Sequence, residues 1–485
     1  MKNKIKDPAQ KKPSLLKSRR FKSGGYAVLV SIVVILVVVA ANLFVGQLPS
    51  TATKFDTTSQ KLFTFSEQTE QLLKNLNTNV TLTLVAESGS EDATTQEMLN
   101  RYKALSDKIT VNVVDPVVQP KFTSKYTTDT VASNSVIVES EKRSKVVAKD
   151  DIYQYDYSNY YTTGNYDVSF AGESALTSAI DYVTSDDLPI IYQLTGHGET
   201  ALSGELKTAV DKDNLTVKDL SLLSMEAVPE DCDSLLIYAP TSDLSEDETT
   251  KIITYMDKGG HLLLITDYSA TERPNLKKLV NNYGVDAVSG MVVEGDANHY
   301  VRGYQHYLLP DVKTHDITQP IIDKKLYVLM PIVEGIVKLD NYRSSLTITD
   351  LLTTSDSAYS KADPEKITSL ERADGDVSGP FDLGVAVTET VGDKETRMVW
   401  FSSSAFLQDK VNEMVGGSNQ DLFLNSLNWM CERENNISIH AKSLDQQYLT
   451  VPDGTATFWS AILAVILPLG IIGAGIFVVV KRRKR

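Results

Sequence analysis

The first part of the chain has a pattern of apolar and polar positions that predicts two strands joined by a helix. Apolar residues alternate with polar ones over 80–85 and 109–114, as in strands with one buried face, and a helical repeat of apolar residues separates the two segments. A strand, a helix and a strand at this spacing form a βαβ unit. Two further strands, near 135–139 and 145–148, are expected to pair as a hairpin. Residues 47–165 are therefore predicted to fold as a small α/β domain.

From residue 189 the pattern changes to continuous apolar strands that alternate with amphipathic helices. Strands are expected at 190–194, 216–220, 234–239, 261–266, 383–388 and 396–402, and helices at 204–211, 246–258, 275–283 and 422–430. Strands that are apolar on both faces and separated by helices indicate a parallel sheet covered on both sides. Residues 166–440 are therefore predicted to form a larger domain. Within it, prolines and a polar run predict an irregular insertion at about 295–380.

Two segments without a charged residue flank these domains. Residues 24–46 and 458–480 are each long enough, as helices, to cross a hydrocarbon core of about 30 Å. The first segment is too long for the apolar region of a signal peptide and is not followed by a small-residue cleavage site, so we expect an uncleaved anchor. A linker at 441–457 would connect the larger domain to the second span.

The distribution of charge predicts how these segments lie in a membrane. Residues 1–23 carry nine Lys and Arg against one acid, and residues 481–485 are all basic, whereas residues 47–457 carry 34 basic against 62 acidic residues. Positively charged flanks stay in the cytoplasm. We therefore expect a two-pass protein of the cell membrane, with both basic tails cytoplasmic and the acidic body extracytoplasmic. An acidic surface repels phosphates, which argues against a nucleic-acid partner.

Together these patterns predict an α/β fold class. The exported body would combine a small βαβ-containing, thioredoxin-like domain with a larger flavodoxin- or Rossmann-like open parallel sheet, and one transmembrane helix would anchor it at each end. Only two cysteines, Cys232 and Cys431, lie in the body, which excludes a disulfide scaffold. The sequence leaves open whether they pair, because pairing requires Cα atoms within about 7 Å of each other.

A histidine between two glycines, directly after the first strand of the larger domain, is the sharpest local signal. In an open parallel sheet, ligands bind beyond the carboxyl ends of the strands. Polar residues follow several such ends here, and the candidate crevice consists of Thr195, Gly196, His197, Gly198, Glu199, Asp243 and Asp267. Three interpretations are open: a ligand or partner groove, a metal or acid–base site at His197, and a structural turn in which the glycines permit tight geometry.

The usual signatures of catalysis are absent from the sequence. The chain has no Walker loop, no G-x-S-x-G elbow, no G-x-G-x-x-G after a strand and no H-E-x-x-H zinc motif. His299, His306 and His315 are too far apart in sequence for all three to share one helical face, and we expect them on exposed loops. We therefore predict a protein that is not an enzyme, with no catalytic residues, no metal site and no cofactor.

Six tyrosines between Tyr153 and Tyr166 are interleaved with small polar residues. Tyrosine-rich loops can serve as recognition surfaces, because the ring offers a large contact area at low entropic cost. The alternative is a loop that simply covers the junction of the two domains.

Motifs at both ends of the body carry a family resemblance. They are Phe55-Asp56, Leu62-Phe63-Thr64-Phe65-Ser66 with the helix to Leu76, Val80-Thr81-Leu82, Leu194-Thr195-Gly196-His197-Gly198-Glu199, and the helix of residues 421–429 with Ile437-Ser438-Ile439 behind it. Their residues and order resemble GldG-type, gliding-motility-associated auxiliary components of ABC transport systems, and the resemblance covers nearly all of residues 26–480. Where that family commonly shows Gly-Asp-Ser, this chain has Ser402-Ser403-Ser404, which removes an acid from the candidate crevice.

The resemblance implies a non-enzymatic, membrane-anchored subunit whose partners are an ABC permease and a cytoplasmic ATPase, with membrane lipid around its two helices. Some members have ties to gliding machinery. Two other functions are open: a free-standing extracytoplasmic receptor for a glycan or peptide, which would use the tyrosine-rich loop, and an exported hydrolase or transferase that would use His197. The sequence specifies neither the transported substance and its direction nor the stoichiometry.

Overall fold

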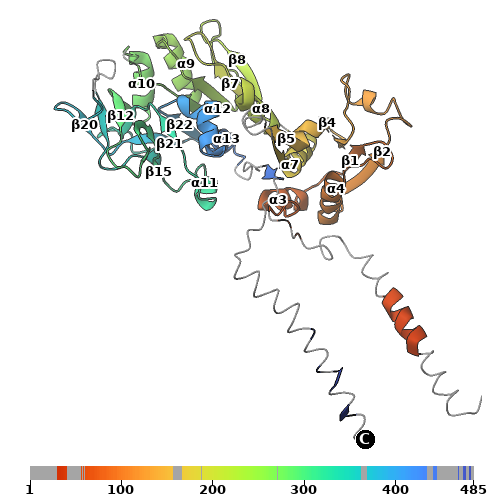
Figure 1. Ribbon diagram of the computed structural model, residues 1–485. Coiled ribbons are helices and arrows are strands. Elements are labelled where there is room, and N and C mark those ends of the chain that lie inside the picture. Colours follow the sequence, from red (N-terminus) through yellow and green to blue (C-terminus); the bar gives the residue numbers. More distant parts are fainter. Residues whose placement is uncertain are drawn as a thin grey trace, which may run out of the picture.

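The computed structural model describes residues 30–40, 56, 58, 60–156, 166–186, 188–269, 271–361, 369–433 and 441–444, together with 468, 473, 475, 476, 480 and 481. Figure 1 shows two folded bodies, with a short helix at 30–40 drawn apart from them. The tail at 1–23, most of both predicted spans and the tyrosines at 157–165 lie outside the described residues. In the described part of the chain, no helix is both long and apolar enough to cross a membrane.

The smaller body contains the predicted βαβ unit and hairpin. Strands β1 (Val80–Val85), β2 (Ile109–Val114), β3 (Ser135–Glu139) and β4 (Ser144–Val147) form one sheet in the order β2-β1-β3-β4. Strand β1 runs parallel to β2 and antiparallel to β3, and β3 is antiparallel to β4. Helix α4 (Ala93–Leu105) is the crossover between the parallel strands. This topology is consistent with the predicted thioredoxin-like domain.

Two further helices pack on this sheet, α3 (Glu67–Lys74) and α7 (Gly172–Thr184). Helix α3 begins where it does because the Ser66 hydroxyl accepts a hydrogen bond from the Thr69 amide. Helix α7 buries an i, i+3, i+4, i+7 stripe in the core of the smaller body: Leu176, Ala179, Ile180 and Val183. The predicted boundary at residue 166 places this helix in the larger domain, but the apolar stripe of α7 packs in the core of the smaller body.

The chain also returns to the smaller body after completing the larger one. Strands β5 (Tyr153–Asp156), β6 (Asp167–Phe170) and β23 (Lys442–Ser443) form a three-stranded antiparallel sheet in the order β23-β6-β5. The amine of Lys442 lies 2.8 Å from the carboxylate of Glu173, at the start of α7. The segment after the larger domain therefore joins the two bodies a second time.

The larger body is built on five parallel strands, as the sequence predicts. They are β8 (Thr216–Leu220), β7 (Ile190–Leu194), β9 (Ser234–Tyr238), β10 (His261–Ile265) and β22 (Lys394–Phe401), in that spatial order. Numbered along the chain, this is the order 2-1-3-4-5 of a flavodoxin-like doubly wound sheet.

Helices cover both faces of this sheet. Helices α8 (Gly204–Lys212) and α13 (Ser418–Met430) pack on one face, whereas α9 (Glu246–Met256) and α10 (Pro274–Asn282) pack on the other. The strands point successive side chains to opposite faces, so Leu236 faces the first pair of helices while its neighbours in the strand face the second pair. This arrangement explains why the central strands β9 and β10 carry apolar residues on both faces.

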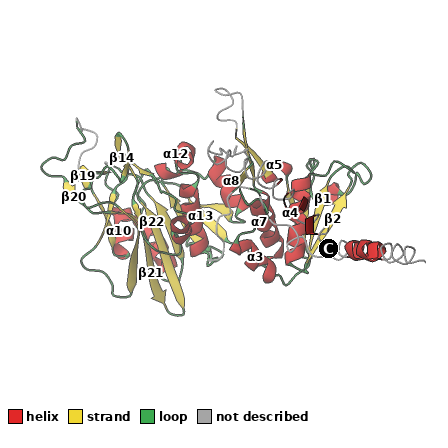
Figure 2. Cartoon of the chain, turned by 60° about the horizontal axis from the view of Figure 1, so that its bottom comes forward, coloured by secondary structure: helices red, strands yellow, loops and turns green. Residues whose placement is uncertain are grey.

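The prediction of a wholly parallel sheet was wrong for its other half. Strand β21 (Asp382–Val391) runs antiparallel to β22, and β18 (Leu346–Thr353), β17 (Gly335–Lys338), β11 (Val285–Val288) and β15 (Asp311–Val312) extend the sheet by further antiparallel pairs. Only Gly392-Asp393 separates β21 from β22, and so short a connection can join antiparallel strands alone. Figure 2 shows these two long strands side by side next to α13.

Much of the insertion that was predicted to be irregular therefore belongs to this sheet. Its remaining parts contribute to two small antiparallel sheets. One sheet contains β12 (Met291–Val293), β19 (Tyr359–Lys361) and β20 (Val377–Ser378), and the other contains β13 (Tyr300–Val301), β14 (Tyr304–Leu308) and β16 (Met330–Pro331). Short helices are α5 (Lys149–Ile152), α11 (Gln319–Asp323) and α12 (Asp409–Met414), with 3-10 turns at Thr123–Lys125 and Ala405–Leu407.

Candidate functional site

The residues predicted to share a crevice follow parallel strands and lie at one edge of the larger sheet. Strands β7, β9 and β10 run in the same direction, as the sequence predicts. The loop at 195–199, Asp243 and Asp267 follow the carboxyl ends of these three strands, in that order. The order of the strands reverses between β7 and β9, and ligands of doubly wound sheets bind at this position. The loop at 195–199, which carries the TGHGE motif, lies there.

The side chain of His197 is held between two carboxylates. Its Nδ1 lies 2.9 Å from Oε1 of Glu199, and its Nε2 lies 3.0 Å from Oε2 of Glu248 on α9. All three side chains are buried. Burial alone would lower the pKa of His197, but the hydrogen bonds with Glu199 and Glu248 outweigh it and raise the pKa above its usual value. The two carboxylates thus favour the protonated imidazole.

The two glycines of this loop permit a tight approach to β9. Gly196 and Gly198 have φ angles of 124° and 74°, a region that suits glycine. A Cβ atom on Gly198 would lie 2.0 Å from the hydroxyl oxygen of Thr241. The amides of Thr241 and Ser242 each donate to the carbonyl of His197 at 3.0 Å. The loop after β7 is therefore bonded directly to the loop after β9.

The two aspartates of the predicted crevice bind other elements. Asp243 accepts hydrogen bonds from the amides of Asn275 and Leu276, each at 2.9 Å, in the first turn of α10. Asp267 accepts from the amide of Ser404 at 2.6 Å and from its hydroxyl at 2.7 Å. Each carboxylate thus ties a strand end to a neighbouring segment, and neither is directed at His197 by any of these bonds.

A buried ionisable pair that the sequence did not single out lies at the same edge. Arg273 donates to the carbonyls of Pro240 and Asp267 at 2.9 and 2.8 Å, and its Nη2 lies 3.9 Å from Oε2 of Glu334. Glu334 is only 7% exposed. Burial raises the pKa of Glu334 to about 7, although the charge of Arg273 opposes this rise. Glu334 lies inside the insertion, where no regular pattern drew attention to it.

These contacts favour the structural interpretation of the TGHGE turn. The predicted crevice contained both His197 and Glu199, but it did not contain Glu248. In the sequence, Glu248 is recognisable only as part of the capping box that it forms with Ser245 at the start of α9. Among the described residues, no group of three or more His, Cys, Asp or Glu is placed to hold a metal ion. Cys232 and Cys431, whose pairing was open, are both free thiols, and burial raises the pKa of Cys232 to about 11.

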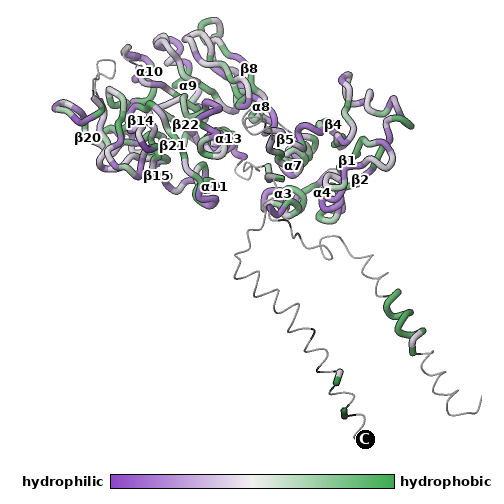
Figure 3. Tube along the Cα trace, in the orientation of Figure 1, coloured by the Kyte–Doolittle hydropathy of each residue, from purple (hydrophilic) through white to green (hydrophobic). Residues whose placement is uncertain are grey.

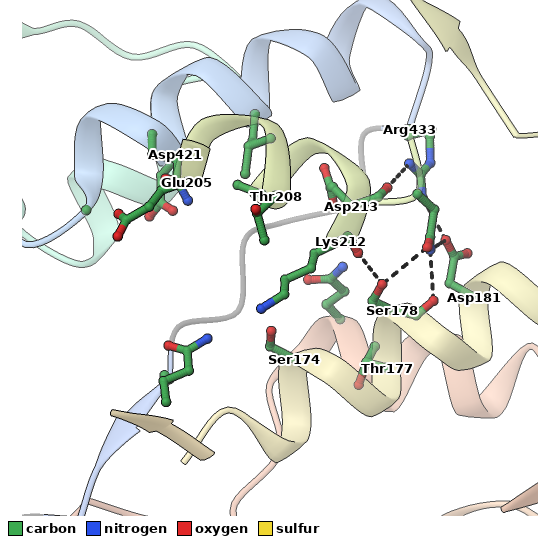
Figure 4. Close-up of a pocket in the computed structure, with 18 of the residues that line it drawn as sticks. Ser174, Thr177, Ser178, Asp181, Glu205, Thr208, Lys212, Asp213, Asp421 and Arg433 are labelled. Atoms are coloured by element: carbon green, nitrogen blue, oxygen red, sulfur yellow. Dashed lines mark hydrogen bonds and ion pairs between the residues drawn. The ribbon is translucent and has the colours of Figure 1, made fainter. Parts of the chain in front are cut away.

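A polar cleft of about 1110 Å³ lies between the two bodies, and none of the predicted crevice residues lines it. Its walls come from α3 and α7 of the smaller body and from α8 and α13 of the larger one. Figure 4 shows Ser174 and Ser178 of α7 facing Thr208 and Lys212 of α8 across this space. The Ser178 hydroxyl donates to the carbonyl of Lys212, so the two walls also touch.

The cleft was not predicted from the sequence, although the residues of each wall recur at helical spacing. Residues lining it recur at i, i+3, i+4 and i+7, as in Ser174, Thr177, Ser178 and Asp181 of α7. A polar stripe of this kind normally faces bulk water. The sequence could not show that four such stripes face one another.

Comparison with family models links the larger body to transport. Residues 189–430 match a family described as an ABC-type uncharacterized transport system, and residues 59–155 match a domain of unknown function, DUF7088. The larger body is thus similar to an auxiliary domain of ABC-type transport, which supports a transport-associated subunit. A search of curated proteins found no match.

Solved structures share only a distant likeness. The chain is 13% identical to an mmIFT52 N-terminal domain, with 50% of this chain and 96% of that one covered and a TM-score of 0.36. It is 10% identical to a glutamine amidotransferase from Thermotoga maritima, with 51% and 99% covered and a TM-score of 0.28. It is 9% identical to PurLQS from the same organism, with 50% and 100% covered and a TM-score of 0.26. Scores this low carry no argument about function.

Proposed function

We propose that this protein is a non-enzymatic, membrane-anchored auxiliary subunit of a GldG-type ABC transport system. The observation that carries the proposal is the match of residues 189–430 to the ABC-type transport family. The extracytoplasmic domains act beside a permease that is driven by a cytoplasmic ATPase. The GldG-type motifs in the sequence support this more specific assignment.

The apolar segments supply the proposed anchors. Apart from Ser31, helix 30–40 consists of apolar residues on all sides (Figure 3). Its side chains are exposed, for example Val30 at 57% and Leu36 at 61%. A helix that is apolar on all sides belongs in a protein core or in lipid. Residues 24–46 and 458–480 contain no charge, and the basic tails outside them favour two cytoplasmic ends.

The geometry at the carboxyl edge supports a role without catalysis. A general base must be free to reach a substrate proton, whereas both ring nitrogens of His197 are engaged by buried carboxylates. Asp243 and Asp267 are bonded to the backbone of neighbouring segments. The edge thus resembles a rigid scaffold more than a reaction centre.

Co-purification from membranes tests the partnership. Gly470 and Ala474 are four residues apart in the second apolar segment, and small residues at this spacing let helices approach closely. Full-length protein should retain an ABC permease and ATPase identified by mass spectrometry, and Gly470→Ile with Ala474→Ile should lose them. The matched control, Val465→Ile with Leu469→Ile, has the same spacing without the change from small to large. Absence of both transport subunits from the wild-type sample would refute the proposal.

Protease accessibility tests the topology. External protease added to intact cells whose outer layers have been removed should digest the acidic body at 47–457 and leave both basic tails protected. Permeabilised cells, in which the tails also become accessible, serve as the control. A body that is protected in intact cells would contradict the proposed orientation.

A further inference from the structure

The cleft between the two bodies is large enough for an extended ligand, such as a short oligomer. Pockets for single small molecules usually hold about 300–1,000 Å³, and they occur preferentially where domains meet. This cleft encloses about 1110 Å³ at such a junction. An extended ligand there would touch both bodies at once.

The lining of the cleft is rich in uncharged hydrogen-bonding groups. Amides and hydroxyls come from every wall, including Gln71 of α3 and Asn75 directly after it, Gln154 of β5, Ser174 of α7, Thr208 of α8 and Gln420 of α13. These groups both donate and accept hydrogen bonds. A ligand with many hydroxyl groups, which also donate and accept, is complementary to such a lining.

The charges of the lining disfavour an anionic ligand. Of the residues that the structure describes, six acidic and two basic ones line the cleft. Both basic residues are engaged, since Arg433 lies 2.6 Å from the carboxylate of Asp181, and Lys212 lies 3.2 Å from that of Asp151. Phosphates and acidic sugars would meet repulsion, whereas neutral hydroxyls can donate to carboxylates.

The few apolar groups of the cleft fit a sugar better than a peptide. Among the described residues of the lining, Leu72 and Leu424 are the only large aliphatic side chains, so a series of apolar peptide side chains would find few partners there. Tyr155, however, lines the cleft and is 39% exposed, with its ring 5.9 Å from that of Tyr166. An exposed phenol ring offers a flat face for the C–H groups of a sugar and a polar tip for its hydroxyls.

We propose that this cleft binds a neutral oligosaccharide. The inference goes beyond the proposed role in transport and does not depend on it, because it concerns the described body and needs no membrane partner. The ligand bridges α3 and α7 on one side with α8 and α13 on the other, so its binding favours one arrangement of the two bodies.

The test is an array of neutral and acidic oligosaccharides probed with the full-length protein in detergent, followed by calorimetry with the best-bound neutral compound. Thr208→Trp places a large side chain in the cleft and should weaken binding by at least about tenfold. Thr250→Trp is the matched control. Both threonines are exposed helix residues whose hydroxyls donate to the carbonyl four residues earlier, but Thr250 lies outside the cleft lining.

A second, milder variant keeps the test valid if Thr208→Trp does not fold. Gln71→Ala removes one amide from the opposite wall without adding bulk, and it should weaken binding in the same direction by a smaller factor. Three results would each overturn the proposal. The protein binds no neutral oligosaccharide, or Thr208→Trp binds the neutral compound as tightly as the wild type does. In the third, the protein binds only acidic sugars or only an oligolysine peptide, which is added as a cationic probe.

Discussion

At the scale of single residues, His197 shows how burial and pairing decide the role of a side chain. Replacing His197 by Gln leaves Glu248 buried without its cationic partner, and we expect a loss of about 1–3 kcal/mol in the free energy of unfolding near pH 6. Because the folded pKa of His197 is raised, its stabilising contribution is complete below the unfolded pKa of about 6.5 and is lost as the pH rises through the folded value. Urea unfolding from pH 6 to 9 measures this difference.

His299 provides a matched control for this prediction. It also lies between two carboxylates, with its ring nitrogens 3.3 Å from Asp296 and 3.3 Å from Asp311, but it is much more accessible to water. Exposed ion pairs contribute little. His299→Gln should therefore change stability by less than about 1 kcal/mol. An equal loss in both variants would show that burial does not set the strength of the His197 contacts.

Glu334 should make stability depend on pH in its own way. Its folded pKa of about 7 lies above the ordinary value of 4.5, so the folded protein holds this proton more tightly than the unfolded chain does. The stabilising effect is therefore greatest below about 4.5 and is lost as the pH rises towards 7. Glu334→Gln cannot titrate, and its melting temperature relative to wild type should rise between pH 5 and pH 8. A difference that is constant with pH would contradict this assignment.

At the scale of elements, Asp243 connects two parts of the doubly wound sheet. It lies after β9 but accepts the amides of Asn275 and Leu276, which begin α10 and have no partner within the helix. Asp243→Ala should reduce stability by about 0.5–2 kcal/mol, the usual cost of losing such an acceptor. Asp243→Asn keeps one acceptor oxygen and should lose less. Faster hydrogen exchange at the two amides in the Ala variant alone would locate the effect at the start of α10.

The elements themselves were largely predictable. Strands β1, β2, β7 and β8 have the predicted bounds, and α8 and α10 differ from their predicted ends by one residue. The sequence failed for the antiparallel half of the larger sheet, although Gly392-Asp393 between two apolar runs is a hairpin signal. Pairing of β18 with β21 joins residues 29 to 43 positions apart, and no local pattern encodes such a partner.

At the scale of the whole molecule, Arg433 links the two bodies. It donates to the carbonyl of Asp213, after α8, at 2.8 Å and to the carboxylate of Asp181, on α7, at 2.6 Å. Arg433→Met keeps the apolar stem but removes both bonds, and the two bodies should then unfold less cooperatively. Calorimetry should show one broadened or two separate transitions.

Arg343 supplies the control for this variant. It forms a comparable double contact with Glu389, at 3.0 and 2.6 Å, but within the larger body. Arg343→Met should lower the melting temperature of the larger body without separating the transitions. If Arg433→Met behaves in the same way, the bond between α7 and the end of the larger domain does not couple the two bodies.

The sequence by itself determined the α/β class, the parallel core of the larger body and the edge at which the TGHGE loop lies. These follow from periodicity over a few residues and from the rule that parallel strands end at one edge. Only the tertiary structure decided that His197 meets Glu248, that Glu334 is buried near Arg273, and that polar helix faces enclose a cleft. Each of these depends on segments far apart in the chain, and their contacts are set by how whole elements pack rather than by the residues beside them.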